Sequence, residues 1–389
     1  MIVRARPKFL ATGQNTGEWS PDPQRLYFDH GRSALSFLLT LLRQRTGRQL
    51  VVGLQSFNCG TVADAIIHSG NRGMVLDVDP ECFSVTPAIV SKSLAELDVL
   101  LLTHYQGLIN PAYAEIAEQC GKQGVWLIDD AAQTEGSRVN GQLIGSLADF
   151  KLESYAFDKP FSSLTGGALL INSRVPPDLQ ADLVRGHAAQ PEEFPRKAQL
   201  DLKALDLLMD WTTPEHYRGR FPYNLVRRLL GAGVPTQAIR GWLVHDPATL
   251  PAKVGRFINH QLTRLSPAFP AVKRLHSLKV KILEQQRATA HRPGIKLWQP
   301  QLNRLGLSIP IFPGVDVHWN RLSVLDSEAG TLRGWCAAHG IEAANYNWPE
   351  PLHVLFADHP RFTMNGAYAA SSLCARRVVN LPIWMEELP

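Results

Sequence analysis

Cysteine is scarce in this chain of 389 residues, which has only five. They are far apart and none belongs to a C-x-x-C pair, which excludes a disulfide framework and a zinc knuckle, and we expect no metal site. The cysteines are Cys59, Cys82, Cys120, Cys336 and Cys374. An odd number of scattered thiols fits a reducing compartment, so we expect a cytoplasmic protein.

Long hydrophobic runs are also missing. No stretch approaches the roughly 18 to 20 apolar residues that cross a bilayer, and runs such as Val99 to Leu102 have the length of a strand. The basic residues near the start are not followed by an apolar segment typical of a signal peptide. With 45% hydrophobic and 19% charged residues, the chain is too apolar for a disordered protein and long enough for two domains.

Charge of one sign is in small excess. The formal net charge is +5. Of the 40 basic residues, 12 are lysine and 28 are arginine. The planar guanidinium suits phosphate and carboxylate, so an anionic ligand is expected. The arginines are scattered and form no basic run with interleaved aromatics, which argues against a nucleic-acid partner. Neither a G-x-G-x-x-G motif nor a Walker loop is present, which lowers the case for dinucleotides or nucleoside triphosphates.

Strand and helix patterns alternate from about residue 26 to 172. Because the strands do not alternate in polarity, they predict an α/β domain with a doubly wound, mostly parallel sheet covered on both faces. The predicted strands are Leu50 to Leu54, Met74 to Val78, Val99 to Thr103, Val125 to Ile128 and Ala168 to Ile171. The predicted helices between them are Ser33 to Arg43, Val62 to His68 and Ala112 to Gly121.

The second half of the chain has a different organisation. Prolines interrupt a mostly helical region from 174 to about 270, and a long helix is predicted from Ala271 to Ala290. Short strands follow, with one helix from Ser327 to His339. We therefore expect a large α/β domain over residues 1–270. A linker helix and a smaller C-terminal α+β domain are expected over residues 271–389.

Ligands of open parallel sheets bind at the carboxyl ends of the strands, so functional residues are sought there. Asp129 and Asp130 follow a predicted strand. Because neighbouring side chains of a strand point to opposite faces, only one of the two carboxylates faces a given ligand. An aspartate at this place also serves commonly as the cap of the following helix.

Two further segments have two interpretations each. Lys159 lies among aromatic, hydroxyl and glycine residues ahead of a buried strand, where a desolvated amine acts as nucleophile or general base. A lysine that reaches from a loop to solvent is the commoner case. Gly31, Arg32 and Ser33 open a helix and offer backbone N–H groups and a hydroxyl to an anion, although a plain cap explains Ser33 equally well.

Together these groups have a recognisable chemistry. An amine, a buried acid, an anion-binding helix start and a nearby serine, Ser154, are what pyridoxal phosphate requires. The amine binds the aldehyde, the acid keeps the pyridine nitrogen protonated, and the helix start binds the phosphate.

The spacing of these residues resembles that of the DegT/StrS-type sugar aminotransferases, which have the fold-type I architecture. The chain reproduces four parts of the family's pattern. These are Asp129-Asp130-Ala131-Ala132-Gln133, Ser154-Tyr155, Lys159, and Gly166-Gly167. Gly31-Arg32-Ser33-Ala34-Leu35 and Thr103-His104-Tyr105-Gln106-Gly107 stand where the family has G-T-x-A-L and H-x-x-G, whereas residues 174–270 match poorly.

The resemblance implies a role for each matching residue. Lys159 holds the cofactor covalently and later shuttles the proton, Asp130 pairs with the pyridine nitrogen, and Gln133 lies beside the phenolic oxygen. Ser154, with Arg32 and Ser33, binds the phosphate. A second subunit completes the site in the family, so a homodimer is expected.

Several departures from the family leave the substrate site open. Cys59 stands where an aromatic residue often stacks on the cofactor ring, so stacking falls to Phe57 or His104 or is absent. Thr165 replaces an acid before the glycine pair. The partner-subunit asparagine motif has only Asn224 as a substitute, and the arginine-rich segment 217–228 fits a diphosphate, a donor carboxylate or a solvated helix face.

The function expected from the resemblance is transfer of an amino group, with glutamate as donor, to a nucleotide-linked keto-sugar. A pyridoxal-phosphate-dependent sugar dehydratase is an alternative, but such relatives have histidine at the position of Lys159. A third alternative is a catalytically silent or regulatory protein with this fold.

Overall fold

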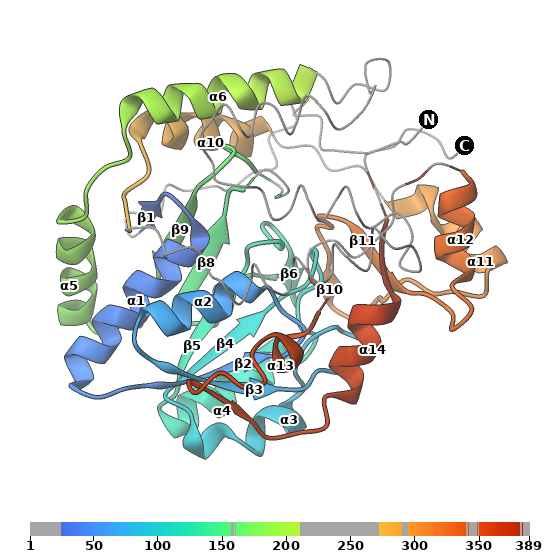
Figure 1. The fold of residues 1–389 in the computed structure, drawn as a ribbon, viewed down its shortest axis with the longest axis horizontal. Coiled ribbons are helices and arrows are strands. Elements are labelled where there is room, and N and C mark those ends of the chain that lie inside the picture. The colour runs from blue at the N-terminus through green and yellow to red at the C-terminus, as the bar shows by residue number, and fades with distance from the viewer. Residues whose placement is uncertain are drawn as a thin grey trace.

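The computed structural model describes residues 25–156, 159, 161–210, 272–289, 295–339, 341, 348, 350–381 and 383. At its centre is one mixed sheet of eight strands (Figure 1). In sheet order these are β1 (Arg25–Phe28), β9 (Gly167–Ile171), β8 (Phe150–Ser154), β5 (Trp126–Asp130), β4 (Val99–Thr103), β2 (Val51–Gln55), β3 (Arg72–Leu76) and β12 (Phe362–Met364). Strand β9 runs antiparallel to β1 and β8, and the other neighbouring strands are parallel.

Two hydrophobic cores lie on opposite faces of this sheet. Val99 and Leu101 of β4 pack into the core that contains α1 (Gly31–Thr46) and α2 (Gly60–His68). Leu100 and Leu102 alternate with them and pack into the core of α3 (Pro87–Ser91) and α4 (Tyr113–Gln123). Because both faces are covered, the strands are apolar on both sides, as the sequence predicts. The predicted α/β class with a mostly parallel sheet is confirmed.

The remaining described elements surround this sheet (Figure 1). Helix α5 (Pro177–Ala188) packs beside α1, and α6 (Pro195–Asp210) contacts α10 (Ser277–Thr289). The C-terminal part has the helices α11 (Gln299–Arg304), α12 (Thr331–Ala338), α13 (Leu352–Leu355) and α14 (Ala369–Arg377). Two small sheets join β10 (Val315–Asp316) to β6 (Arg138–Val139) and β7 (Gln142–Leu143), and β11 (Leu322–Leu325) to β13 (Val378–Leu381).

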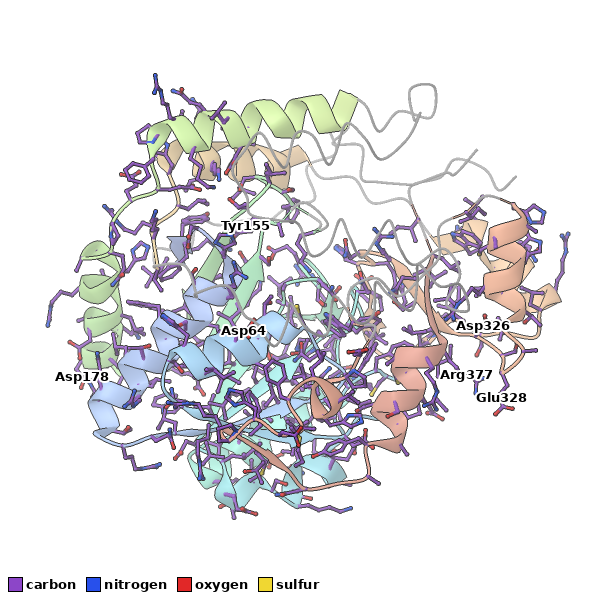
Figure 2. All side chains as sticks on the ribbon, viewed as in Figure 1. Asp64, Tyr155, Asp178, Asp326, Glu328 and Arg377 are labelled. Atoms are coloured by element: carbon purple, nitrogen blue, oxygen red, sulfur yellow. The ribbon has the colours of Figure 1, made fainter. Side chains whose placement is uncertain are left out.

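The observed element boundaries differ slightly from the predicted ones. Strand β4 has the predicted limits, and the other four predicted strands are shifted by one or two residues. Helix α12 begins at Thr331 rather than Ser327, because Asp326, which is labelled in Figure 2, accepts hydrogen bonds from the N–H groups of Leu332 and Arg333 at 2.9 and 3.0 Å. Strands β1, β8 and β12 were not predicted.

The division into domains stays a prediction, since its boundary at residue 270 lies outside the described residues. Strand β12 comes from the C-terminal part and extends the central sheet beside β3. Among the helices of the described ranges, none combines the length and the apolar character that crossing a bilayer requires.

Candidate active site

Three polar residues end neighbouring parallel strands on the same face of the sheet. Thr103, Asp130 and Ser154 are the last residues of β4, β5 and β8. Each is an even number of residues from a side chain in the core of α1 and α2, namely Leu101, Ile128 and Leu152. These three residues therefore face the side of the sheet that α1 and α2 cover.

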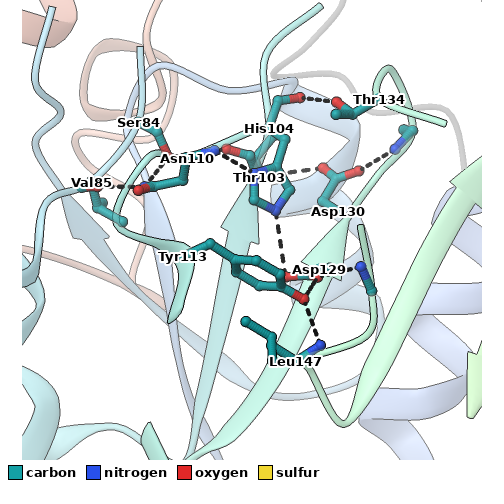
Figure 3. A network of polar contacts seen from close by, with 12 residues as sticks. Ser84, Val85, Thr103, His104, Asn110, Tyr113, Asp129, Asp130, Thr134 and Leu147 are labelled. Carbon is teal, nitrogen blue, oxygen red and sulfur yellow. Dashed lines mark hydrogen bonds and ion pairs between the residues drawn. The ribbon is translucent and has the colours of Figure 1, made fainter. Parts of the chain in front are cut away.

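The two adjacent aspartates are held by different groups (Figure 3). Asp130 accepts hydrogen bonds from Thr103 Oγ1 at 3.2 Å and from the Ala132 N–H at 3.1 Å. Asp129 faces the other side, where it accepts hydrogen bonds from Tyr113 Oη and from the Gly145 N–H. As the alternation of the strand predicts, only one of the two carboxylates faces the side of α1 and α2.

Lys159 lies close enough to Asp130 for its charge to act on the carboxyl group. Burial raises the pKa of Asp130 above its ordinary value, while the Ala132 N–H, the positive charge of Lys159 and the Thr103 hydroxyl act in the opposite direction. The side chain of Lys159 is partly buried, and its backbone N–H donates to the Ala156 carbonyl at 3.0 Å. The structure thus brings together an amine and a buried acid that are 29 residues apart in the sequence.

The start of α1 lies against the ends of β8 and β9. A methyl group at Gly31 would stand 3.3 Å from Ser154 Cβ, and one at Gly167 would stand 2.3 Å from the Gly31 nitrogen. The first amides of a helix have no partner within the helix and favour an anion. Ser33 is fully buried in this first turn. The glycines therefore permit a close approach that places Ser154 beside the start of α1.

Arg32 lies in the same turn and acts on Asp64 of α2. Burial raises the pKa of Asp64 to about 6, and the positive charge of Arg32 opposes that rise. The predicted phosphate residue Arg32 thus has an acidic neighbour in the structure.

Gln133 follows β5 and is almost fully buried. Its Oε1 accepts a hydrogen bond from the Gln106 N–H at 3.2 Å. Its Nε2 has no hydrogen-bond partner in the part of the chain that the structure describes. A buried amide without a partner is unfavourable unless a ligand supplies the acceptor.

The predicted aromatic neighbours of a cofactor have other surroundings. His104 is fully buried, with Nε2 at 3.4 Å from Asp129 Oδ1 and Nδ1 accepting from the Asn110 N–H at 3.1 Å (Figure 3). Phe57 is fully buried against Tyr105 and Trp348. Contact of either ring with a cofactor stays a prediction. Cys59 is partly buried, and its Sγ is 3.2 Å from Thr61 Oγ1.

Three residues near the site were given no role in binding or catalysis from the sequence. Thr103 and Asn58 are linked to Asp130 by hydrogen bonds, and Thr165 contacts a buried lysine, Lys279, at 2.8 Å. Thr103 ends a predicted strand, so its position at the carboxyl end of that strand could have marked it as a candidate site residue. Asn224 and the segment 217–228 lie outside the described residues.

Residues 26–189 match the DegT/DnrJ/EryC1/StrS aminotransferase family. This segment of the chain is therefore similar to that family. The segment contains the predicted site residues from Arg32 to Lys159, so the resemblance inferred from their spacing is confirmed. This aminotransferase family is pyridoxal-phosphate-dependent.

Individual relatives are similar over a limited part of their length. The chain is 32% identical over 147 residues to the dTDP-4-dehydro-2,3,6-trideoxy-D-glucose 4-aminotransferase of Saccharopolyspora spinosa, which covers 37% of each chain. It is 25% identical over 140 residues to the pleiotropic regulatory protein of Geobacillus stearothermophilus, which covers 36% of this chain and 37% of that protein. The chain thus matches little more than a third of the length of these relatives.

The likeness in fold extends further than the likeness in sequence. The crystal structure of a DegT DnrJ EryC1 StrS aminotransferase from Brucella abortus has a TM-score of 0.58 at 17% identity, covering 92% of this chain and 80% of that chain. The fold of the chain is therefore that of the fold-type I aminotransferases, as the sequence predicts.

Proposed function

We propose that this chain is a pyridoxal-phosphate-dependent aminotransferase that transfers an amino group from glutamate to a nucleotide-linked keto-sugar. The observation that carries the proposal is the effect of the Lys159 charge on Asp130, a buried carboxylate at the end of a central parallel strand. A lone amine or a lone buried acid has many roles. The two together, beside an anion-binding helix start, suit this cofactor.

The residues present fit the cofactor in two further respects. Gln133 Nε2 is a buried donor that needs an acceptor, which the cofactor's phenolic oxygen would provide. Gly31 closely approaches both Ser154 and Gly167. This brings the backbone N–H groups in the first turn of α1 close to the Ser154 side chain. A phosphate is the ligand that such a helix start favours.

When bound, pyridoxal phosphate supplies an electron-accepting ring that lets an amino group and a proton leave one substrate carbon and reach another. In the proposed mechanism Lys159 holds the cofactor and, once released, moves the proton as general base. Asp130 keeps the ring nitrogen protonated, since a carboxylate beside that nitrogen favours its charged form. Ser154, Ser33 and Arg32 bind the phosphate, and Gln133 orients the ring.

The substrate and the assembly rest on relatives rather than on contacts. The relative in Saccharopolyspora spinosa is named for the 4-amination of a dTDP-linked keto-sugar, and a relative in Acidithiobacillus ferrooxidans is named for the 3-amination of a UDP-linked one. A nucleotide-linked keto-sugar is their shared feature, and we extend it to this chain. We also propose a homodimer whose second subunit completes the site.

The first test is the absorption spectrum of the purified protein with pyridoxal phosphate. The bound cofactor should give a visible band that survives gel filtration and is lost in Lys159→Ala. Lys122→Ala is a matched control, because that lysine lies on the exposed side of α4 and pairs with Glu118 at the surface. Loss of the band in both variants, or in neither, would contradict the role of Lys159.

The second test follows the amino group. Glutamate should convert the bound cofactor to its amino form, with loss of the visible band. A panel of nucleotide-linked keto-sugars should then restore the band with the true acceptor. A protein that binds the cofactor but is indifferent to every amino donor would favour the dehydratase alternative.

A silent or regulatory protein is the second candidate. Cys59 at the expected place of the stacking ring favours it, and so does the name of the relative in Geobacillus stearothermophilus. A colourless protein that does not take up pyridoxal phosphate would support this candidate and refute the aminotransferase.

A further inference from the structure

A chain of three buried polar side chains leads to the proposed cofactor acid. Asn58 Nδ2 donates to Thr103 Oγ1 at 2.9 Å, and Thr103 Oγ1 lies 3.2 Å from Asp130 Oδ2. Asn58, Thr103 and Asp130 are 1%, 2% and 7% exposed. Asn58 lies just before α2, and Thr103 and Asp130 end two neighbouring strands. These hydrogen bonds therefore join three elements of the site.

The direction of each hydrogen bond follows from one backbone contact. The Cys59 N–H donates to Asn58 Oδ1 at 2.7 Å, which identifies that atom as the acceptor and leaves Nδ2 as the donor toward Thr103. The Thr103 hydroxyl has a single proton. Because the Thr103 oxygen already accepts a hydrogen bond from Asn58, its proton points to Asp130. The Asp130 carboxylate accepts this hydrogen bond.

Asp130 needs such donors, because burial opposes its ionisation. A buried carboxyl group tends to become neutral, and a neutral Asp130 would lose its attraction for a protonated ring nitrogen. The groups that act on it from the surrounding elements are the Ala132 N–H, the positive charge of Lys159, the Thr103 hydroxyl and the His104 ring. Among these groups Thr103 is the side chain that donates a hydrogen bond to Asp130, and a substitution removes this donor without changing a charge.

We propose that Asn58 and Thr103 are positioning residues that hold the Asp130 carboxylate charged and oriented toward the cofactor's ring nitrogen. This inference rests on the proposed function. Asn58 acts through Thr103, and Thr103 acts through Asp130; neither is a catalytic residue. The chain also explains why Thr103 is a hydroxyl residue, whereas Leu101 and Val99 on the same face of β4 are apolar.

The first experiment measures the carboxyl group itself in the cofactor-free protein. The infrared carbonyl band of protonated Asp130, identified by its loss in Asp130→Asn, is titrated in each variant. In Thr103→Val the pKa of Asp130 should rise by about one unit, since a hydrogen bond to a charged group is lost without a change in volume. Asn58→Leu should raise it less, and Thr103→Ser should leave it unchanged.

The second experiment measures cofactor binding. The dissociation constant of pyridoxal phosphate, obtained from its visible band, should increase roughly tenfold in Thr103→Val and less in Asn58→Leu, with Thr103→Ser close to the unsubstituted protein. Thr103→Ala replaces the valine variant if that variant does not fold. Each variant is also melted in the cofactor-free state, because a purely structural role would lower the melting temperature without moving the pKa of Asp130.

The outcomes separate this inference from the proposed function. An unchanged Asp130 pKa in Thr103→Val, or in Asn58→Leu, would overturn the positioning role even where the protein binds the cofactor. If the infrared shifts occur but the unsubstituted protein gives no cofactor band, the hydrogen-bonded chain stands and the proposed function fails.

Discussion

Lys279 of α10 donates a hydrogen bond from its fully buried ammonium to Thr165 Oγ1 at 2.8 Å. The same ammonium lies 3.0 Å from Glu193 and also pairs with Asp201 of α6. Thr165 precedes Gly166, whose carbonyl accepts a hydrogen bond from the Tyr155 N–H at 2.9 Å. This hydrogen bond joins the two ends of the segment that contains Lys159. A buried ion cluster therefore connects α6 and α10 to the segment of the proposed catalytic lysine.

Replacing Lys279 by methionine should destabilise the protein strongly. The substitution leaves buried carboxylates without their central cation, which typically costs about 3 to 5 kcal/mol. Urea unfolding of the cofactor-free protein measures the loss. Lys197→Met is the matched control, because Lys197 contacts the same two carboxylates at 2.7 Å but has a 40% exposed side chain. An equal loss in both variants would contradict a special role of the buried ammonium.

The adjacent carboxylates Asp129 and Asp130 should respond differently to the same substitution. Asp130→Asn should weaken cofactor binding and leave the free energy of unfolding of the cofactor-free protein little changed. Asp129→Asn should keep cofactor binding but lower the free energy of unfolding by about 1 to 3 kcal/mol, because it disturbs the buried contacts with Tyr113 and Gly145. Cofactor titration and urea unfolding of both variants check this. The same pattern in the two variants would refute the division of roles.

Alanine at Gly167 should disturb the anion-binding helix start. Its Cβ would stand 2.3 Å from the nitrogen and 2.4 Å from the Cα of Gly31, and backbone atoms cannot yield as the end of a flexible side chain does. We expect lower stability and a weaker affinity for pyridoxal phosphate. Gly121→Ala is the control, since nothing lies within 4 Å of its Cβ in α4 and a helical alanine stabilises by about 0.5 to 1 kcal/mol. Equal affinity in both variants would show that the close approach is dispensable.

The strands of the central sheet were predictable where they are apolar on both faces. Strand β4 consists of apolar residues up to its final threonine, and its limits were predicted correctly. Strand β8 contains Lys151 and Glu153, which are buried as ion pairs: Glu153 lies 3.0 Å from Lys151 and 2.6 Å from Arg25. Its sequence is therefore typical of a polar segment. The partner that neutralises Glu153 from β1 is Arg25, which lies 128 positions away, so the local sequence does not show that β8 is buried.

The candidate site shows the same division between local and distant information. The position of Asp130 follows from a local rule, since ligands bind at the carboxyl ends of parallel strands. Ser154 was singled out by the family's spacing instead, because the strand that it ends, β8, was not predicted. The alternation of a strand likewise predicts that Asp129 and Asp130 face opposite sides. The bond from Asn58 to Thr103 joins residues 45 positions apart, and the hydrogen bond from Lys279 to Thr165 joins residues 114 positions apart. No periodicity or spacing in the sequence encodes either contact.

Asp64 should make the stability of the cofactor-free protein depend on pH. Burial raises its pKa to about 6, above the value of about 3.9 in an unfolded chain. The folded state therefore binds the proton more tightly, and the stability that Asp64 contributes at low pH is lost as the pH rises from about 4 through about 6. The loss should be at most about 2 kcal/mol, because the carboxyl group is partly exposed and screened.

The measurement compares urea unfolding at several pH values in the unsubstituted protein and in Asp64→Asn. As the pH rises through that range, the unfolding free energy of the unsubstituted protein should fall relative to that of Asp64→Asn. Asp178→Asn is the control of opposite sign: this surface carboxylate on α5 pairs with Arg45, which lowers its pKa (Figure 2). Its substitution should therefore cost stability above the ordinary aspartate pKa and not below it. Parallel pH profiles for the unsubstituted protein and Asp64→Asn would mean that folding does not raise the pKa of Asp64.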